Sequence, residues 1–369
     1  MSLPGAIERT PMLDRWVQIN EDGTITVNTG KVEIGQGIKT AIAMIASEEL
    51  DVSIDRILVQ TADTAITPNE AMTAGSMSVE SSGSAVRVAS ATARQILLVL
   101  ASETLGVDPA TLTVQDGLVG SSDSNEQTDY WSLQGGHPFS ITILDTPPLK
   151  DPHTYQIVGK RSSRIDLPAK VRGDVAFLQD MILPQMRHGR MVKPPTANAT
   201  LREYPASLDM PDIQIVRDGR FLAVIADREE RAVMAAQRLA ANCRWESPAL
   251  TPLPIEVPAY LKNNVNRSLP VVDGTPVVEP VPIAQVPEGA SSTLNATYYR
   301  PFQMHGSIGP SAALAQFMNG LLTVYSHSQG VEILKTALAS ALELPLDRVH
   351  VIHAEGAGCY GHNGADDVA

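Results

Sequence analysis

The chain has 369 residues, 43% apolar and 19% charged, so it is long enough to form two or three domains with sizeable cores. Lys and Arg number 28 against 41 Asp and Glu, and the net charge of -13 disfavours nucleic acid and anionic membranes as partners. Cys243 and Cys359 stand alone and far apart, which indicates neither a disulfide framework nor a structural zinc site.

The N-terminal region contains no pattern typical of a targeting segment. Residues 1–14 have no continuous apolar stretch, and the longest apolar run, Ile96–Ala101, is too short to span a bilayer. We therefore expect a cytoplasmic protein without a direct membrane segment.

The first part of the chain predicts a strand, a tight Gly turn, a second strand, a helix and a third strand. Asp-Gly between alternating apolar residues is a strong hairpin signal. A Gln-Gly pair then precedes an amphipathic segment, which predicts a helix. The elements are strands at 17–19 and 25–27 around Glu21-Asp22-Gly23, a helix from Gln36-Gly37 to about Leu50, and a strand at 55–59.

A polar loop, residues 64–78, follows this unit and contains the small-residue run Thr73–Ser78. Its hydroxyl groups at Ser76 and Ser78 suit either capping of the next helix or contact with a phosphate. The sequence then predicts a long helix at 79–105, a hairpin at 112–119 and a flexible connector at 120–127.

The middle of the chain predicts a separate α+β domain after a boundary near residue 150, which prolines mark. A proline-rich stretch, residues 247–288, argues against regular helix and favours an extended wrapping linker. The expected elements between them are strands at 156–158, 175–177, 189–192, 213–216 and 221–225 and a helix at 228–241.

The unit at the start of the chain is repeated near its end. A helix N-terminus presents unpaired N–H groups, so the two Gln-Gly openings are two candidate sites for an anion or an oxo group. An amide there can donate and accept a hydrogen bond without adding a charge, although a solvated cap is also open for Gln36 and Gln329. The second copy has strands at 315–317 and 322–324 around Asn319-Gly320, a helix from Gln329-Gly330 to about Leu344, and a strand at 347–351.

After the last predicted strand, Gly356, Gly358 and Gly361 have the G-x-G-x-x-G spacing of a dinucleotide fingerprint. A glycine-rich turn needed only for backbone geometry remains the alternative. No histidine has metal-ligand spacing, and His305 and His327 are candidates either to line a cavity or to fill a core. Because no helix follows Asp366 and Asp367, we expect the chain to be the front part of a longer protein.

Together these motifs resemble the molybdopterin-binding large subunits of the xanthine dehydrogenase and aldehyde oxidase family, in particular its isoquinoline and nicotinate hydroxylase branch. The resemblance covers nearly the whole chain. It depends on the stretches Gly30–Leu50, Thr67–Ser78, Val158–Phe177, His188–Pro195, Ser326–Gly330 and Glu355–Asp367.

The resemblance implies an α+β fold in which mixed α/β cofactor-binding units flank an α/β hammerhead domain. The domains expected from it are a molybdopterin-binding unit at 1–150, the hammerhead domain at 151–247, the proline-rich linker at 248–290, and the start of a second molybdopterin-binding domain at 291–369.

The resemblance also implies roles for individual residues. Gln329 matches a glutamine that hydrogen-bonds an oxygen ligand of molybdenum, and Asn363 stands where some relatives have a substrate-facing carboxylate. Because this residue is Asn, purine oxidation is in doubt. The metal is held by the pterin, and the general-base glutamate of the family lies beyond this chain. Cofactor contacts are expected from Gln36, Gly37, Gly75, Ser76, Ser78, Gly358, Cys359, Tyr360 and Gly361.

The implied activity is oxidation of an N-heterocyclic aromatic compound or an aldehyde, with water as the oxygen source. The implied cofactor is molybdopterin, in the cytosine dinucleotide form, with molybdenum. Expected partners are a small [2Fe-2S] subunit, the missing C-terminal half of the same subunit, and a cytochrome or flavin acceptor. The isolated fragment is expected to be inactive. Two alternatives stay open, an NAD(P)-dependent dehydrogenase that uses Gly356, Gly358 and Gly361, and a non-catalytic assembly or binding fragment.

Overall fold

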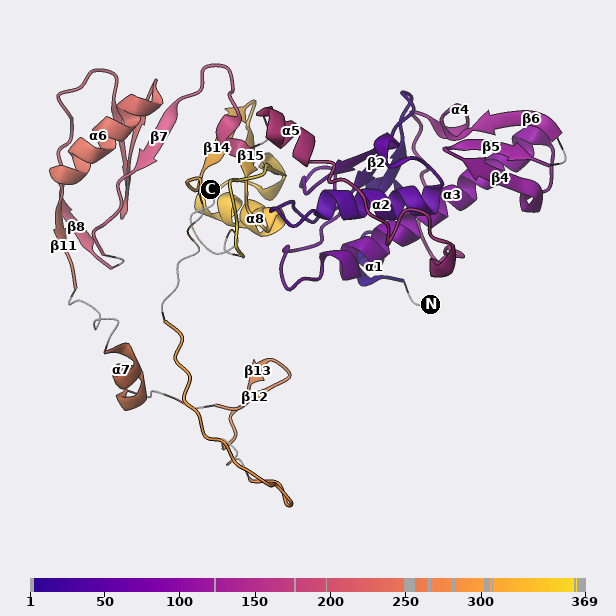
Figure 1. Ribbon diagram of the computed structural model, residues 1–369. Helices are drawn as coiled ribbons and strands as arrows, with labels where there is room; N and C mark the ends of the chain where they lie inside the picture. Colours follow the sequence, from indigo (N-terminus) through magenta and orange to yellow (C-terminus); the bar gives the residue numbers. More distant parts are fainter. Residues whose placement is uncertain are drawn as a thin grey trace. The chain divides into compact units, whose positions relative to one another are not determined.

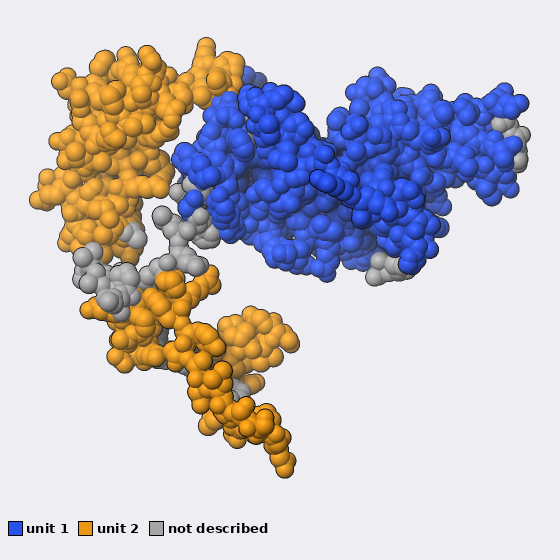
Figure 2. All heavy atoms as spheres, in the orientation of Figure 1, with its two compact units in different colours: residues 1–181, 305–369 blue, residues 182–304 orange. Residues whose placement is uncertain are grey.

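The computed structural model describes residues 3–122, 124–175, 177–196, 198–248, 256–264, 267, 269–280, 283, 285–301, 306, 308–361 and 363. They form two compact units, shown in blue and orange in Figure 2. Unit 1 joins residues 1–181 to residues 305–369, and unit 2 is the stretch between them. The chain thus mixes helices and sheets, as predicted. The domain boundaries expected at residues 150, 247 and 290 stay a prediction.

The first repeat of unit 1 is a three-stranded sheet with one crossing helix (Figure 1). Its hairpin closes at Gly23, whose φ of +86° is a conformation that favours glycine. The hairpin strands are antiparallel, and the strand that follows the helix is parallel to the second one. The elements are β1 (Val17–Ile19), β2 (Ile25–Asn28), α2 (Ile38–Leu50) and β3 (Ile57–Gln60).

The second repeat has the same strand order and the same strand directions. Asn319 and Gly320 both have positive φ, at +52° and +75°, as expected for the two-residue turn. Its elements are β14 (Ala313–Met318), β15 (Leu321–Ser326), α8 (Val331–Ala341) and β16 (Val349–His353). The duplication predicted from the sequence is therefore confirmed as a duplicated topology.

The chain that leaves the first repeat lies along the edge of the second. Asp63 forms an antiparallel bridge with Ile352, and the backbone N–H of His353 donates to the carbonyl oxygen of Ala62 over 2.8 Å. Ala62 is fully buried in a cluster that contains Val324 and Val351 of the second repeat. The two copies thus share backbone hydrogen bonds and a core.

A long helix supports the first repeat. It begins with a π-helical turn (Ser78–Gly83) and continues as α3 (Ser84–Leu105), whose buried alanines allow close packing against α2. By length and hydropathy alone the stretch Ser78–Leu105 could cross a membrane, but half of the window is buried among other elements, as in many core helices. That test is therefore weak evidence for a membrane span. The short α1 (Gly5–Arg9) also packs against α3.

Three local predictions for unit 1 are wrong. The expected connector at 120–127 contains a third strand, so the hairpin is part of a three-stranded sheet. Residues 156–158 form no strand, because the Glu48 carboxylate accepts their N–H groups. Of the strand expected at 175–177, Val175 and Phe177 are not extended strand, and residue 176 lies outside the described residues. The elements here are β4 (Leu112–Gln115), β5 (Leu118–Ser121), β6 (Ser124–Asp129), α4 (Tyr130–Gln134) and α5 (Leu167–Arg172).

Unit 2 contains the other predicted strands and helix of the middle domain. A core around Leu222, Val224 and Leu239 joins the helix to the sheet. The proline-rich stretch is not wholly extended as predicted, because a short helix begins just before Pro258, which is tolerated in a first helical turn. The elements are β7 (His188–Met191), β8 (Thr200–Glu203), β9 (Gln214–Asp218), β10 (Phe221–Ala226), α6 (Glu229–Ala241), β11 (Arg244–Glu246), α7 (Val257–Asn263), β12 (Val271–Val272) and β13 (Thr275–Pro276).

Candidate functional site

The second repeat places two strand ends and a helix start together. β15 and β16 are parallel and paired, with Ser326 opposite His353 at their carboxyl ends. The loop after β15 leads directly into α8 at Gly330. Ligands of open α/β sheets bind outside the carboxyl ends of parallel strands, so this edge is the natural place for a site.

Gln329 is the centre of this edge. Its backbone N–H donates to the carbonyl oxygen of Asn363 over 2.8 Å, and its Nε2 donates to the carbonyl oxygen of Thr73 over 2.7 Å. The Thr73 N–H donates back to the Gln329 carbonyl oxygen over 2.8 Å. The structure therefore brings together the start of the Thr73–Ser78 loop, Gln329 and Asn363, which are remote in sequence. The Gln329 Oε1 atom is buried and has no hydrogen-bond partner in the part of the chain that the structure describes.

The glycine-rich loop covers the same edge. A Cβ on Gly356 would lie 2.8 Å from Cγ of His327, and one on Gly358, whose φ is +120°, would lie 2.8 Å from the Tyr360 ring. Packing and backbone conformation thus require both glycines. Cys359 is 2% exposed, and its Sγ accepts the N–H of Gly361 over 3.3 Å.

Asn363 is buried next to His327, with its Nδ2 atom 2.8 Å from Nδ1 of the ring. The Ala312 N–H donates to Nε2 of His327 over 3.2 Å, so this histidine lines the base of the loop. Tyr360 is 58% exposed. The predictions for His305, Asp366 and Asp367 fall outside the described residues.

The first Gln-Gly opening differs from the second, because Glu33 already binds the helix start. The fully buried Glu33 carboxylate accepts the N–H groups of Gly35 and Gly37, each over 2.9 Å, and that of Lys39 over 3.1 Å. Gln36 is exposed, and its side chain stabilises the loop in which it lies. Its Oε1 accepts the Ile34 N–H over 2.7 Å, and its Nε2 donates to the Val32 carbonyl oxygen over 2.8 Å. This helix start was a candidate anion site because of its N–H groups. Those groups already bind the Glu33 carboxylate, which is an anion of the protein itself.

The second repeat has Ser326 where the first has Glu33, four residues before the glycine that opens the helix. Ser326 Oγ accepts the Ser328 N–H over 3.1 Å, and Ser328 Oγ accepts the Gly330 N–H over 3.1 Å. Neutral hydroxyls thus replace the carboxylate. Of the two equivalent openings, the second keeps more of the positive end of its helix dipole.

A charge network links the two repeats, and sequence reasoning missed it. Lys39 Nζ lies 2.9 Å from Glu355 Oε1, and Lys170 Nζ lies 2.6 Å from Glu355 Oε2. Burial alone would raise the pKa of Asp166, but hydrogen bonds from Arg164 and Lys170 outweigh it and hold the pKa far below its usual range. The six-residue charge network consists of Glu33, Lys39, Arg164, Asp166, Lys170 and Glu355.

The predicted phosphate-binding residues lie where α3 begins. Gly75 and Ser76 are exposed and have φ of +66° and +59°, and Ser78 opens the π-helical turn. A cavity of about 680 Å³ adjoins this loop. Burial lowers the pKa of Lys31, whose Nζ donates to the Glu70 carbonyl oxygen over 2.8 Å. The residues lining the cavity include Arg9, Lys31, Glu70, Met77, Ser81 and Arg87.

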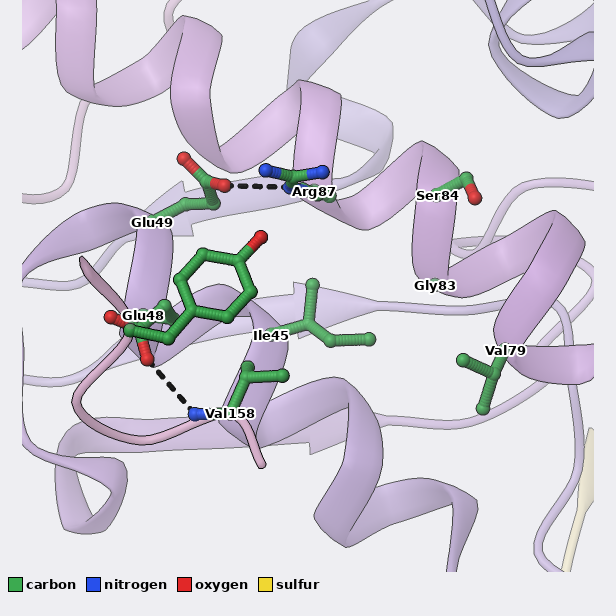
Figure 3. Close-up of a pocket in the computed structure, with 9 residues that line it drawn as sticks. Ile45, Glu48, Glu49, Val79, Gly83, Ser84, Arg87 and Val158 are labelled. Carbon is green, nitrogen blue, oxygen red and sulfur yellow. Dashed lines mark hydrogen bonds and ion pairs between the residues drawn. The ribbon is translucent and has the colours of Figure 1, made fainter. Parts of the chain in front are cut away.

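A second cavity, shown in Figure 3, has a structural explanation. Its volume is about 150 Å³, far smaller than the 680 Å³ of the first cavity. Beside it, the Glu48 carboxylate accepts the N–H of Val158 over 2.9 Å, and Arg87 Nε donates to Glu49 over 2.8 Å. These carboxylates fix the segment after residue 150 to α2 and α3.

His353 ends β16 on the buried face, and neither ring nitrogen has a hydrogen-bond partner among the residues with a described structure. Burial, together with the nearby Lys39 charge, lowers the pKa of His353 to about 3. Among the residues that the structure describes, His, Cys, Asp and Glu form no group of three or more that could hold a metal ion.

The low pKa of His353 predicts a pH-dependent loss of stability. The unfolded chain takes up a proton at His353 below about pH 6.5, whereas the folded chain does so only near pH 3. Protonation therefore favours the unfolded state, and the free energy of unfolding is highest at neutral pH and falls as pH is lowered through this range. Between about pH 6.5 and 4.5 this loss amounts to about 2 to 3 kcal/mol. When urea unfolding is compared at these two pH values, we expect His353→Leu to lack this loss of unfolding free energy. Replacement of the exposed His137 by Leu is the control. Equal pH slopes for His353→Leu and the unmodified protein would contradict the burial argument.

Comparisons with known proteins give a consistent result. Models of the family described as "Molybdopterin cofactor-binding domain" match residues 6–163 and 282–367. The chain is 34% identical to a nicotinate dehydrogenase subunit of Pseudomonas putida over 96% of its own length and 30% of that protein. It is 25% identical to a membrane-bound aldehyde dehydrogenase (pyrroloquinoline-quinone) of Gluconacetobacter polyoxogenes, over 94% of this chain and 46% of that protein.

The beta chain of isoquinoline 1-oxidoreductase from Brevundimonas diminuta is 27% identical, over 63% of this chain and 35% of that protein. Two of the three relatives are named as subunits. The chain spans between 30% and 46% of the length of these curated relatives.

Proposed function

Because the chain belongs to the family of molybdopterin-binding large subunits of the xanthine dehydrogenase type, we propose that it is part of a molybdenum hydroxylase. The proposed substrate is an N-heterocyclic aromatic compound or an aldehyde. Relatives named for nicotinate, isoquinoline and aldehyde support both substrate classes. None of these three relatives is named for nicotinamide-dependent chemistry, so we do not propose the dehydrogenase alternative.

The observation that carries the proposal is the buried, unpartnered Oε1 of Gln329. Leaving a buried acceptor without a partner is costly, so this side chain suits a polar ligand at the strand edge. The amide brings no charge and is held by Thr73, and because its Oε1 accepts hydrogen bonds, it suits a hydroxyl or N–H group of a cofactor that carries its own metal ligands. When bound, the cofactor supplies the redox metal for a two-electron oxidation in which water provides the oxygen atom.

Around this amide, we assign the other predicted roles as follows. The backbone of Gly358, Cys359, Tyr360 and Gly361 covers the metal end of the cofactor, and Asn363 faces the substrate pocket. Gly75, Ser76 and Ser78 bind phosphate, and Gln36 and Gly37 are assigned to the cofactor only from the family resemblance. Arg9, Lys31 and Arg87 line the 680 Å³ cavity together with Glu70 and Glu80, and we assign this cavity to the pyrophosphate of a dinucleotide form of the cofactor, proposed as the cytosine form from the family resemblance.

The proposed assembly includes several parts outside this chain. Residues 151–247 are assigned as the hammerhead domain. Two electrons leave through a small [2Fe-2S] subunit to a cytochrome or flavin acceptor, and the C-terminal half of the large subunit supplies the general-base glutamate. The isolated chain is therefore proposed to be inactive.

The test is to purify the full-length large subunit with its partner subunits. We expect molybdenum and an oxidisable pterin in the preparation, and reduction of an artificial electron-accepting dye by nicotinate, isoquinoline or an aldehyde. The same preparation made from cells grown without molybdate is the control. Bound nicotinamide in place of molybdenum, or a metal-loaded complex inert toward all three substrates, would overturn the proposal.

A further inference from the structure

Glu355 is the residue directly before the glycine-rich loop, and both its side chain and its backbone are held from outside the second repeat. Lys39 in the first turn of α2 and Lys170 in α5 bind its two carboxylate oxygens. The Leu178 N–H donates to its carbonyl oxygen over 2.7 Å. Three segments remote in sequence thus converge on the base of the loop.

The six-residue charge network continues from Glu355 to the start of α2. Lys170 Nζ also lies 2.6 Å from Asp166, which binds Arg164 over 2.6 Å. Arg164 donates to the Gly35 carbonyl oxygen over 2.8 Å and lies 3.6 Å from Glu33. Three carboxylates therefore balance three cations, and each carboxylate is at least nine-tenths buried, so the set is neutral only when complete.

The Gly356–Gly361 loop, which follows Glu355, has high intrinsic conformational freedom, so contacts from other segments help to hold it in one conformation. It contains Gly356, Gly358 and Gly361 within six residues, and glycine loses more conformational freedom on ordering than any other residue. Its buried side chain, Cys359, bonds within the loop, and Tyr360 is largely exposed.

We propose that Glu355 is a positioning residue, which through the six-residue charge network holds the Gly356–Gly361 loop closed against the start of α2 and α5. The network thereby keeps Gln329 and the loop in one site with the first repeat. The catalytic consequence rests on the proposed function, whereas the closure of the loop does not.

Cys359 supplies a direct measurement of this closure, because it is 2% exposed and reacts with a thiol reagent only when the loop opens. The full-length subunit in its native complex is treated with N-ethylmaleimide, and alkylation of Cys359 is followed by peptide mass spectrometry. Cys243, which is partly exposed and lies in unit 2, is the reference thiol in the same sample, and a rise in its rate marks a disturbance beyond the loop.

We expect Glu355→Gln and Lys170→Met to speed alkylation of Cys359 by about tenfold or more, because each leaves the six-residue charge network with one uncompensated charge. Lys170→Arg keeps the positive charge between the two carboxylates and is expected to raise the rate clearly less than Lys170→Met does. Arg172→Met is the matched control on the same helix, because it removes only the exposed ion pair with Asp174. The Cys243 rate is expected to be unchanged in every variant.

Unchanged alkylation of Cys359 in Glu355→Gln, or an equal rise at Cys243, would overturn the proposal. So would a Lys170→Arg variant as reactive as Lys170→Met. In the loaded complex we further expect Glu355→Gln to lower kcat more than it raises KM, at unchanged molybdenum content. If no molybdenum is found at all, the proposed function fails, but the alkylation rates still decide whether the network closes the loop.

Discussion

Replacement of Gln329 by Ala is expected to lower turnover of the intact enzyme by about 100-fold or more, which is the scale for loss of one preorganised hydrogen-bonding group at a reacting centre. Gln329 is buried, its amide is fixed by Thr73, and its Oε1 has no partner among the described residues. Removing the amide therefore removes a group already aimed at a ligand. The backbone bonds of residue 329 to Thr73 and Asn363 do not need the side chain.

The measurement is steady-state dye reduction together with molybdenum and pterin content. We expect cofactor content to stay largely intact while kcat falls. Gln316→Ala, a glutamine change on β14 of the same repeat, is the control and is expected to leave both unchanged. Unchanged turnover in Gln329→Ala would remove this residue from the site.

Replacement of Glu33 by Ala is expected to lower the free energy of unfolding by about 3 kcal/mol or more, because breaking a buried charged set leaves its partners uncompensated. The Glu33 carboxylate is fully buried and accepts three backbone N–H groups at the start of α2. Its loss also leaves Arg164 with one carboxylate instead of two.

Urea unfolding followed by circular dichroism measures this effect. Glu103→Ala, an exposed glutamate change on α3, is the control and is expected to alter stability by less than about 0.5 kcal/mol. If Glu33→Ala were as stable as this control, the carboxylate would not be the anion that holds the helix start.

The duplicated fold was predictable because its signals are local. Asp22-Gly23 and Asn319-Gly320 determine two hairpins, and apolar periodicity after each Gln-Gly pair indicates a helix. Each signal extends over fewer than about 15 residues, so no knowledge of tertiary contacts is needed. The strand at 124–129 escaped prediction because its sequence, SNEQTD, has no apolar alternation.

The local structure around the site was harder to predict where a buried carboxylate accepts backbone N–H groups. Glu48 takes the N–H groups of residues 156–158, which removes them from any sheet, and Glu33 takes those at the start of α2. The role of Glu33 could have been predicted from the sequence, because it is an acidic residue four positions before the glycine that opens the helix. The pairing of Lys39 with Glu355 crosses 316 positions, and sequence patterns alone do not reveal such a partner.

Asp63 and His350, paired at 2.6 Å, are 287 positions apart. At a synthesis rate of about 5–20 residues per second, roughly 15 to 60 s separate the appearance of these two residues on the ribosome. Throughout that interval the outgoing segment of the first repeat lacks the strand with which it later pairs. Chaperones that shield unpaired strand edges during translation are therefore expected to raise the yield of this protein.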